Sequence, residues 1–210
     1  MAKTIVFQGD SITDAGRNYD AELPANLGMG IGYAFMAAAE LLAKEPEKDY
    51  QIYNRGISGH RVVDLYARWK KDTLNLRPDI LSILIGVNDT WHEKAHQNGV
   101  EVPRYAQFYR MLLDWTLKEL PEVKLVLIEP FVLLTGAVKE DWIDEINARR
   151  QVVKEIAGEY NTLFLPAQSI FDEAAKRAEY TYWLKDGVHP TSAGHKLLAD
   201  AWIDLTKDIR

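Results

Sequence analysis

The sequence predicts an α/β fold in which parallel strands are joined by crossover helices. Short apolar runs bounded by turn residues alternate along the chain with longer segments of helical pattern, which is typical of βαβ units. The third run, ILSILIGV, has almost no polar alternation, as expected of a central strand covered on both faces. At 210 residues and 47% hydrophobic content, the chain is long enough for one sizeable core, so we expect a single domain.

The elements follow from these runs in chain order. The apolar runs predict strands at Thr4–Gly9, Gln51–Asn54, Ile80–Gly86, Lys124–Glu129 and Thr162–Leu165. The segments between them have the apolar spacing of helices that pack on one face. These helices are predicted near Ile31–Ala43, Val62–Leu74, Arg104–Leu120, Trp142–Tyr160, Gln168–Arg177 and Ser192–Thr206.

The last helix has the clearest start, and one loop has no periodicity at all. Thr191 follows Pro190 and is a suitable N-cap. The apolar stripe of this helix is predicted at Ala193, Leu197, Leu198, Ala201 and Leu205. Phe131–Asp141 shows no clear periodicity, so we predict a surface loop beyond the fourth strand.

Composition excludes several classes of function. The net charge of -6 comes from 31 acidic and 25 basic residues without a basic block, so nucleic acid is not expected as a partner. Without cysteine, there is no disulfide, thiolate nucleophile or Cys-based metal site. The start, MAKTIVFQG, lacks the apolar region of a signal peptide, and no run approaches the length of a membrane span. We expect a cytoplasmic protein without membrane contact, and leave homo-oligomerisation open.

Four segments carry polar residues to the ends of predicted strands or close to the C-terminus. They are GDSIT (residues 9–13), NRGISGH (54–60), GVNDTW (86–91) and DGVHP (186–190). Ligands of an open parallel sheet bind outside the carboxyl ends of its strands. We therefore expect these segments to meet at one edge.

The residue types in these segments suit nucleophilic catalysis. A serine hydroxyl needs an adjacent base, normally a histidine oriented by a carboxylate; Ser11, His189 and Asp186 supply this set. The attack creates an oxyanion, which needs preorganised donors. Candidate donors are the backbone amides of Ser11 and Gly59 and the side-chain amide of Asn88.

Together, the four segments resemble those of the SGNH (GDSL-type) hydrolases. GDSI stands where the family name has GDSL, and an apolar side chain of similar volume is kept. The resemblance implies a flavodoxin-like, three-layer α/β/α sandwich with a parallel sheet of about five strands. It also implies Ser11 as nucleophile, Asp186 and His189 as the rest of the triad, and Ser11, Gly59 and Asn88 as oxyanion donors. Gly56 lies in the same segment; Gly59 is chosen because the family's donor follows the Ile-Ser pair.

Each candidate also has a plain structural interpretation. Ser11 is suited to an N-cap, and Asp10 and Asp14 to caps and turns rather than a metal pair. Asn88 and Asp89 could form an Asx turn, with Asp89 as a prop. The candidates for lining a substrate pocket are Asp10, His60, Trp91 and Trp183, and core packing is an equal alternative for Trp183. His92, His96 and His195 do not have metal-ligand spacing.

The predicted function is a serine esterase that needs no cofactor or metal. The longer pattern, which runs through Arg68–Trp69 and Trp91, resembles the branch of the family with acetyl xylan esterases and carbohydrate deacetylases. This implies acetylated sugars, such as xylo-oligosaccharides, as the small-molecule ester substrate. One alternative is a lysophospholipase or thioesterase acting on longer acyl chains. Another is a non-enzymatic α/β module in which Asp10 and Asp14 hold Mg²⁺.

Overall fold

A parallel β-sheet forms the centre of the molecule. The computed structural model describes residues 2–20 and 23–210. Within them the sheet has five strands in the order β2-β1-β3-β4-β5, and every neighbouring pair is parallel. The strands are β1 (Thr4–Gly9), β2 (Gln51–Asn54), β3 (Ile80–Leu84), β4 (Lys124–Ile128) and β5 (Leu163–Leu165). The predicted fold class is confirmed, and the order is that of flavodoxin-like sheets, whose switch point lies between β1 and β3.

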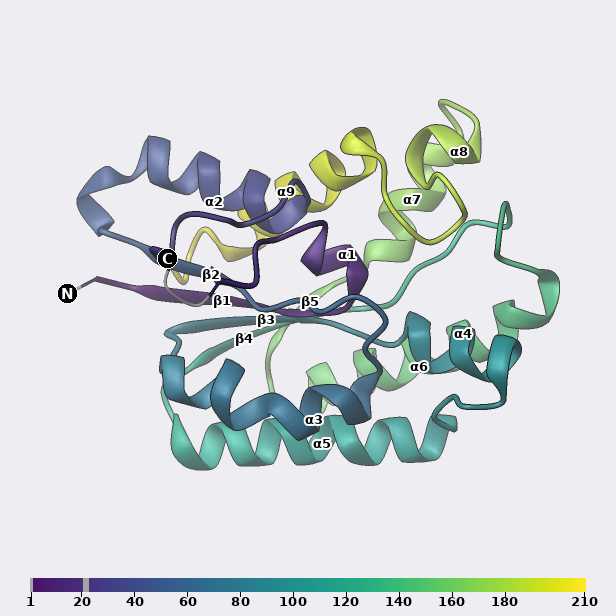
Figure 1. Cartoon of the computed structure of the whole chain (residues 1–210), viewed down its shortest axis with the longest axis horizontal. Helices are drawn as coiled ribbons and strands as arrows, with labels where there is room; N and C mark the ends of the chain where they lie inside the picture. Colours follow the sequence, from purple (N-terminus) through teal and green to yellow (C-terminus); the bar gives the residue numbers. More distant parts are fainter. Residues whose placement is uncertain (1, 21–22) are drawn as a thin grey trace.

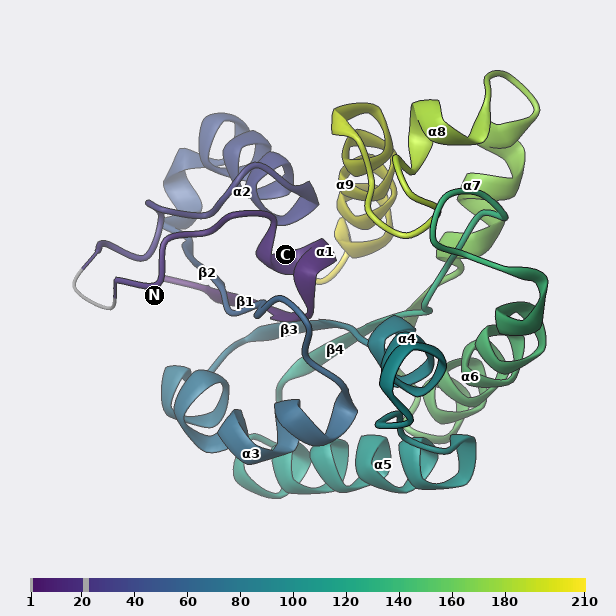
Figure 2. The ribbon, with the colours of Figure 1, turned by 45° about the vertical axis from the view of Figure 1, so that its right-hand side comes forward.

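Helices cover both faces of the sheet and complete a three-layer sandwich (Figure 1). One face carries α2 (Tyr33–Lys44), α7 (Ala167–Ala175), α8 (Tyr180–Trp183) and α9 (Ser192–Thr206). The other carries α3 (Val62–Asp72), α5 (Val102–Glu119) and α6 (Glu140–Glu159). Figure 2 shows α2 beside α9 on one side of the sheet and α3 beside α5 on the other. Two short 3₁₀ helices, Pro46–Lys48 and Leu74–Leu76, complete the connections.

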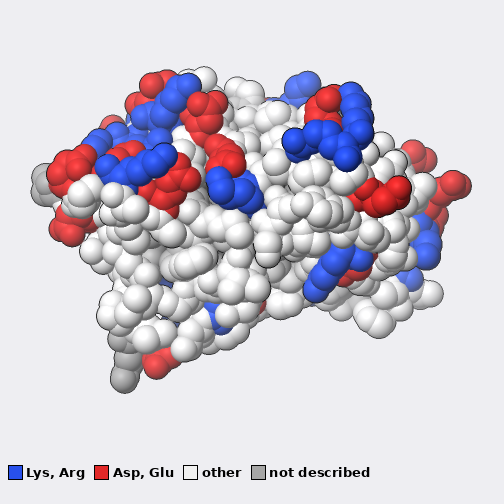
Figure 3. Space-filling model, turned by 90° about the horizontal axis from the view of Figure 1, so that it is seen from above, with Lys and Arg blue, Asp and Glu red and all other residues white. Residues whose placement is uncertain are grey.

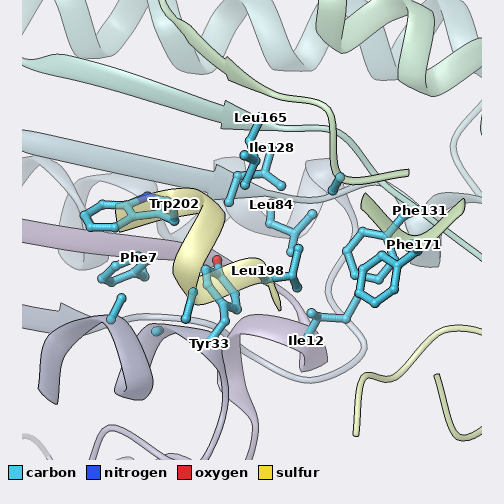
Figure 4. Packing of buried hydrophobic residues seen from close by; sticks show 14 of the residues in the cluster. Phe7, Ile12, Tyr33, Leu84, Ile128, Phe131, Leu165, Phe171, Leu198 and Trp202 are labelled. Atoms are coloured by element: carbon cyan, nitrogen blue, oxygen red, sulfur yellow. The ribbon is translucent and has the colours of Figure 1, made fainter. Parts of the chain in front are cut away.

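Successive residues of a strand point into different halves of the core. Ile5 and Phe7 pack in the half under α2 and α9, whereas Val6 packs in the half under α3 and α5. Figure 4 shows Phe7 beside Trp202 of α9, with ring centroids 4.8 Å apart. Because both faces are buried, the strands are apolar throughout, which explains the unbroken run that predicted β3.

Two further helices begin directly after central strands. They are α1 (Ser11–Asp14), which follows β1, and α4 (Val87–His96), which follows β3. The sequence did not predict α4, because only its first turn, Val87 to Thr90, is buried and the rest has no apolar stripe. Both helices lie at the end of the sheet to which the strand arrows point (Figure 1).

The predicted start of α9 is confirmed, but its predicted apolar stripe is displaced. The Thr191 hydroxyl caps the helix by accepting a hydrogen bond from the Gly194 amide at 3.3 Å. The buried face is Gly194, His195, Leu198, Ala199, Trp202 and Thr206. Polar members of this face satisfy their groups internally, since Thr206 donates to the Trp202 carbonyl at 2.8 Å. The apolar pattern therefore placed the buried face of α9 about one residue before its actual position.

The segment after β4 is a loop, as predicted, but only part of it lies on the surface, where Leu134, Gly136 and Lys139 are exposed. Phe131, Val132, Leu133 and Val138 are all buried. Its backbone bonds to the segment before α9, with the Leu133 amide donating to the Gly187 carbonyl at 2.9 Å. The loop therefore packs against the part of the chain that carries DGVHP.

The outer surface of the α2–α9 layer mixes charges of both signs. Figure 3 shows acidic and basic side chains adjacent to one another, with broad uncharged areas between the groups. Glu40 pairs with Lys44 on α2, and Lys196 with Asp200 on α9. Among the helices of the described residues, none combines the length and apolarity needed to cross a bilayer.

Candidate active site

Ser11 lies at the switch point of the sheet, as the first residue of α1. Asp10 caps this helix, because its Oδ1 accepts a hydrogen bond from the Ile12 amide at 3.0 Å. Asp10 is only 1% exposed, and burial raises its pKa to about 7. Asp10 therefore supports the turn that presents Ser11. The prediction that Asp10 lines the substrate pocket is wrong, because its side chain has almost no exposed surface with which to contact a substrate.

Residues 184–190, here called the His189 loop, bring a histidine and a carboxylate to Ser11. The Ser11 Oγ lies 2.8 Å from His189 Nε2, and His189 Nδ1 lies 2.7 Å from Asp186 Oδ2. The other carboxylate oxygen accepts hydrogen bonds from the amides of Val188, at 3.1 Å, and His189, at 2.8 Å. The three predicted residues thus form one hydrogen-bonded chain.

The electrostatics of this chain favour an ionised carboxylate. Burial acts to raise the pKa of Asp186, but the hydrogen bonds from the His189 amide and ring and the Val188 amide outweigh it and hold the pKa below its usual value. A carboxylate at Nδ1 keeps the ring proton on that nitrogen, which leaves the Nε2 lone pair facing the Ser11 hydroxyl. The arrangement can therefore take a proton from the serine as its oxygen attacks a carbonyl.

Residues 55–60, here called the Gly59 loop, follow β2 and contain two glycines, of which Gly56 lies against α1. The His60 amide donates to the Ile57 carbonyl at 3.2 Å, and Gly59 has a φ of 81°. A turn with positive φ at its third position requires glycine in most cases. Gly56 is needed for a different reason, since a Cβ there would lie 2.3 Å from the Asp14 amide nitrogen.

Hydrogen bonding separates the two glycines as candidate donors. The Gly56 amide already donates to Asn54 Oδ1 at 3.0 Å. Within the described residues, no group accepts a hydrogen bond from the Gly59 amide, and a Cβ at Gly59 would meet nothing within 4 Å. The open position of Gly59 fits the choice made from the sequence, because a free donor in open space can reach a ligand.

Asn88 and Asp89 lie in the first turn of α4. This helix follows β3, whereas the Gly59 loop follows β2, so the two segments flank the end of β1. The Asn88 Nδ2 donates to the His60 carbonyl at 3.1 Å, and an amide nitrogen has a second proton to offer. Asp89 is fully buried and accepts a hydrogen bond from the Val62 amide at 3.2 Å. Burial raises the pKa of Asp89 to about 7. Asp89 therefore supports the contact between α4 and the start of α3, as the prop interpretation expected.

The remaining pocket candidates have three different environments. His60 is half-buried, and its Nδ1 accepts a hydrogen bond from Arg68 Nε at 3.1 Å; burial, followed by the charge of Arg68, lowers its pKa. Trp91 packs beside His189 with ring centroids 5.9 Å apart, so it borders the site. Trp183 is 7% exposed and belongs to the core; of its two interpretations, core packing describes the structure.

Asp14 is occupied by groups of the chain itself. Its Oδ1 accepts from the Arg17 amide at 3.1 Å, and its Oδ2 accepts from the Ser58 amide at 2.9 Å and from the Tyr19 hydroxyl. In residues 2–20 and 23–210, no three His, Asp or Glu side chains gather as a metal-binding group would. Asp10 is buried and both oxygens of Asp14 accept hydrogen bonds from the chain, so neither carboxylate of the alternative Mg²⁺ module is presented as an open ligand.

Two supports of the site were missed by sequence reasoning. The loop after β4 backs the His189 loop, with the Ala137 amide donating to the Asp186 carbonyl at 2.9 Å. The apolar letters FVL at residues 131–133 were an available signal for this burial. Arg68 donates to the Arg55 carbonyl of the Gly59 loop and to the Gly9 carbonyl of β1. The family pattern included Arg68, but no local signal identified these partners.

The chain matches the model of the GDSL-like lipase/acylhydrolase family over residues 7–197. The chain belongs to this family. An acetylxylan esterase from Geobacillus stearothermophilus is 36% identical over 201 residues, which cover 95% of this chain and 91% of that protein. This family member is accordingly a carboxylic ester hydrolase, as predicted.

Solved structures of family members agree with the fold. A protein of Parabacteroides merdae, proposed to be a GDSL-like lipase, has a TM-score of 0.93 at 42% identity and covers 100% of this chain and 98% of its own. The G. stearothermophilus acetylxylan esterase has a TM-score of 0.87 at 34% identity, covering 97% and 93%. Alanine variants of a serine, an aspartate and a histidine of that enzyme are described as catalytic mutants, and the aspartate and histidine are three residues apart.

Proposed function

We propose that this family member is a serine esterase that removes O-acetyl groups from xylo-oligosaccharides or related sugars through an acyl-enzyme intermediate. The observation that carries the proposal is the hydrogen-bonded chain Ser11–His189–Asp186. It is supported by the relative whose corresponding residue types, with the same three-residue spacing of aspartate and histidine, are described as catalytic.

In the first half of the reaction, the Ser11 Oγ attacks the acetyl carbonyl and its proton passes to His189 Nε2. The imidazolium that forms is stabilised by Asp186. Collapse of the tetrahedral intermediate breaks the bond to the sugar oxygen, which takes the proton from His189 as it leaves. In the second half, water adds to the acetyl-serine with the same histidine as base, releasing acetate and restoring Ser11.

The developing negative charge on the carbonyl oxygen needs donors that are already in place. Three are available around Ser11: its own amide at the start of α1, the Gly59 amide, and the second proton of Asn88 Nδ2. They come from the ends of β1, β2 and β3, which are neighbours in the sheet. The sheet topology thus supports an oxyanion hole built from three segments.

The proposed substrate class rests on the relative and on the surroundings of His189. The G. stearothermophilus enzyme is described as an acetyl-xylooligosaccharide esterase. In this chain Trp91 packs beside both His189 and Trp142, with ring centroids 5.9 Å and 5.3 Å away. An aromatic ring at the edge of the site can pack against a sugar face or a small acyl group.

The test is acetate release from singly acetylated and peracetylated xylose oligosaccharides, with p-nitrophenyl acetate and p-nitrophenyl octanoate alongside. We expect preferential turnover of the acetylated sugars and its loss in Ser11→Ala, while the melting temperature stays near that of the wild type. Preference for octanoate would move the enzyme to longer acyl chains and overturn the substrate class. Substantial turnover by Ser11→Ala would overturn the mechanism.

A further inference from the structure

Arg68 has an environment unlike that of an ordinary surface arginine. It lies in the second turn of α3, and its side chain is 11% exposed. Four of the five guanidinium donors are used. Nε donates to His60 Nδ1 at 3.1 Å, Nη1 to the Arg55 carbonyl at 2.7 Å and to Asp72 Oδ2 at 3.2 Å, and Nη2 to the Gly9 carbonyl at 3.1 Å.

Three of these four bonds go to the segments that carry the proposed catalytic groups. Gly9 is the last residue of β1, two residues before Ser11. Arg55 and His60 are the first and last residues of the Gly59 loop. A single planar group therefore ties the strand end that presents Ser11 to both ends of the loop that presents the Gly59 amide.

The same contacts reach Asn88 through His60. One proton of Asn88 Nδ2 is donated to the His60 carbonyl at 3.1 Å, so the position of His60 determines where the second proton points. Arg68 holds the ring of that same residue. Hence the two donors that lie outside α1 share one anchor.

We infer that Arg68 is a positioning residue, which acts through Gly59 and Asn88 to aim the oxyanion donors at the point reached by the Ser11 nucleophile. The inference rests on the proposed function of that site. A displacement of about 1 Å in a reacting geometry can cost about 100-fold in rate. Lysine would keep the charge and the pair with Asp72, but a single ammonium cannot replace a fork of four bonds.

The experiment measures kcat and KM for p-nitrophenyl acetate in Arg68→Lys, Asn88→Ala and the double variant. Arg68→Lys should lower kcat by about 10- to 100-fold and leave KM nearly unchanged. In the Asn88→Ala background, the same substitution should cost much less, because one of the donors that it misaligns is already gone. Equal losses in both backgrounds, or a kcat like that of the wild type, would overturn the inference.

Three further variants separate positioning from stability. Asp72→Asn removes the charge partner of Arg68 but none of its loop contacts, so it should change kcat far less than Arg68→Lys does. Trp69 follows Arg68 on α3, and its Nε1 donates a hydrogen bond to the Thr116 hydroxyl of α5 at 2.9 Å. Thr116→Val removes this acceptor and should lower the melting temperature without lowering kcat. If Arg68→Lys does not fold, His60→Ala replaces it in the cycle, since it deletes only the ring contact.

In that substitute cycle, His60→Ala should lower kcat severalfold in the wild type and much less in the Asn88→Ala background; additive losses would overturn the inference.

The outcome is distinguishable from a failure of the proposed function. If Ser11→Ala and Asn88→Ala both keep full turnover of p-nitrophenyl acetate, the proposed site itself is wrong. If they lose turnover and Arg68→Lys is additive with Asn88→Ala, only the positioning inference fails.

Discussion

The His189 loop and the Gly59 loop face the same serine but are held in opposite ways. The His189 loop is closed largely by bonds within itself: Asp186 accepts from the amides of Val188 and His189, and the Lys185 amide donates to the His189 carbonyl at 3.0 Å. The Gly59 loop is held from outside. Its contacts come from Arg17, Asn54, Arg68, Asn88 and Asp14.

This difference explains what a local motif can carry. DGVHP holds the hydrogen bonds that orient its histidine, because a carboxylate three residues before a histidine can accept from both the backbone and the ring. NRGISGH holds only its own turn, and the direction of its donors is determined by side chains from α1, α3 and α4. Substitutions in the two loops should therefore fail in different ways.

The largest effect is expected from Asp186→Asn, which tests the self-contained loop. The asparagine oxygen can still accept from the Val188 and His189 amides, so the loop should stay folded. Its NH₂ group would face His189 Nδ1, which favours the ring tautomer whose Nε2 carries the proton and cannot accept one from Ser11. We expect kcat to fall by about 10⁴-fold with an unchanged melting temperature.

Steady-state kinetics with p-nitrophenyl acetate and a thermal melt check this prediction together. The matched control is Asp200→Asn, which changes an exposed carboxylate on α9 that pairs with Lys196. A variant Asp186→Asn that kept a tenth or more of the wild-type kcat would show that Asp186 does not orient the histidine.

The next largest fall in kcat is expected from Asn88→Ala, which tests one of the contacts that hold the Gly59 loop from outside. Loss of one oxyanion donor typically costs about 100- to 1000-fold in kcat, and KM should change little because the bond strengthens only in the transition state. Single-turnover measurements on the ester substrates would separate acylation from binding. A pure increase in KM would assign Asn88 to substrate binding instead.

The two glycines of the Gly59 loop sharpen the comparison further. Alanine at Gly59 meets no neighbouring atom, but its φ of 81° is strained. Relief of that strain turns the Ser58–Gly59 peptide over and points the Gly59 amide away from Ser11. Gly59→Ala should therefore lower kcat by about 100-fold, as for a lost donor, and leave the fold intact.

Gly56→Ala provides the contrasting variant. Its Cβ would lie 2.3 Å from the Asp14 amide nitrogen, so the loop must separate from α1 and the melting temperature should fall. Circular dichroism melts and kcat, measured on both variants, distinguish the two effects. The assignment of the donor to Gly59 fails if Gly59→Ala retains the wild-type kcat.

The fold was largely predictable because its signals are local. The ranges of β1, β2 and α9 match those predicted from the sequence, since apolar runs, turn residues and the Thr191 cap lie within a few positions of one another. The motifs also placed Ser11, His189 and Asp186 in one cluster. What could not be predicted depends on distant partners, such as Arg68 against Gly9 or Asp14 against Ser58.

The errors have the same origin. Helix α4 was missed because its outer turns are exposed, and the loop after β4 was predicted to lie on the surface although its apolar side chains cover the His189 loop. The stripe of α9 was misplaced because His195 and Thr206 are buried through hydrogen bonds rather than through apolarity. Burial of a polar residue is decided by the partner that it finds, and that partner is far away in sequence.

His195→Gln gives the smallest expected effect on activity and a measurable one on stability. His195 lies on α9, just beyond the His189 loop, and its Nδ1 accepts a hydrogen bond from the Tyr33 amide at 3.1 Å. Burial, and then the nearby charges of His189 and Lys185, lower the pKa of His195 from 6.5 to about 4. Between those values the unfolded chain binds the proton that the folded protein excludes, so stability is complete above pH 6.5 and decreases as the pH falls toward 4.

The loss attributable to this one group is on the order of 3 kcal/mol across that window. Glutamine can offer an oxygen to the Tyr33 amide but does not titrate. The free energy of unfolding in urea, measured at pH 4.5, 5.5 and 7.5, should therefore depend less steeply on pH in His195→Gln than in the wild type. The kcat at pH 7.5 should stay near that of the wild type, because the hydrogen bond that His195 accepts comes from the Tyr33 amide and not from the triad. Parallel pH profiles for the two proteins would show that His195 is not the residue that the folded state keeps neutral.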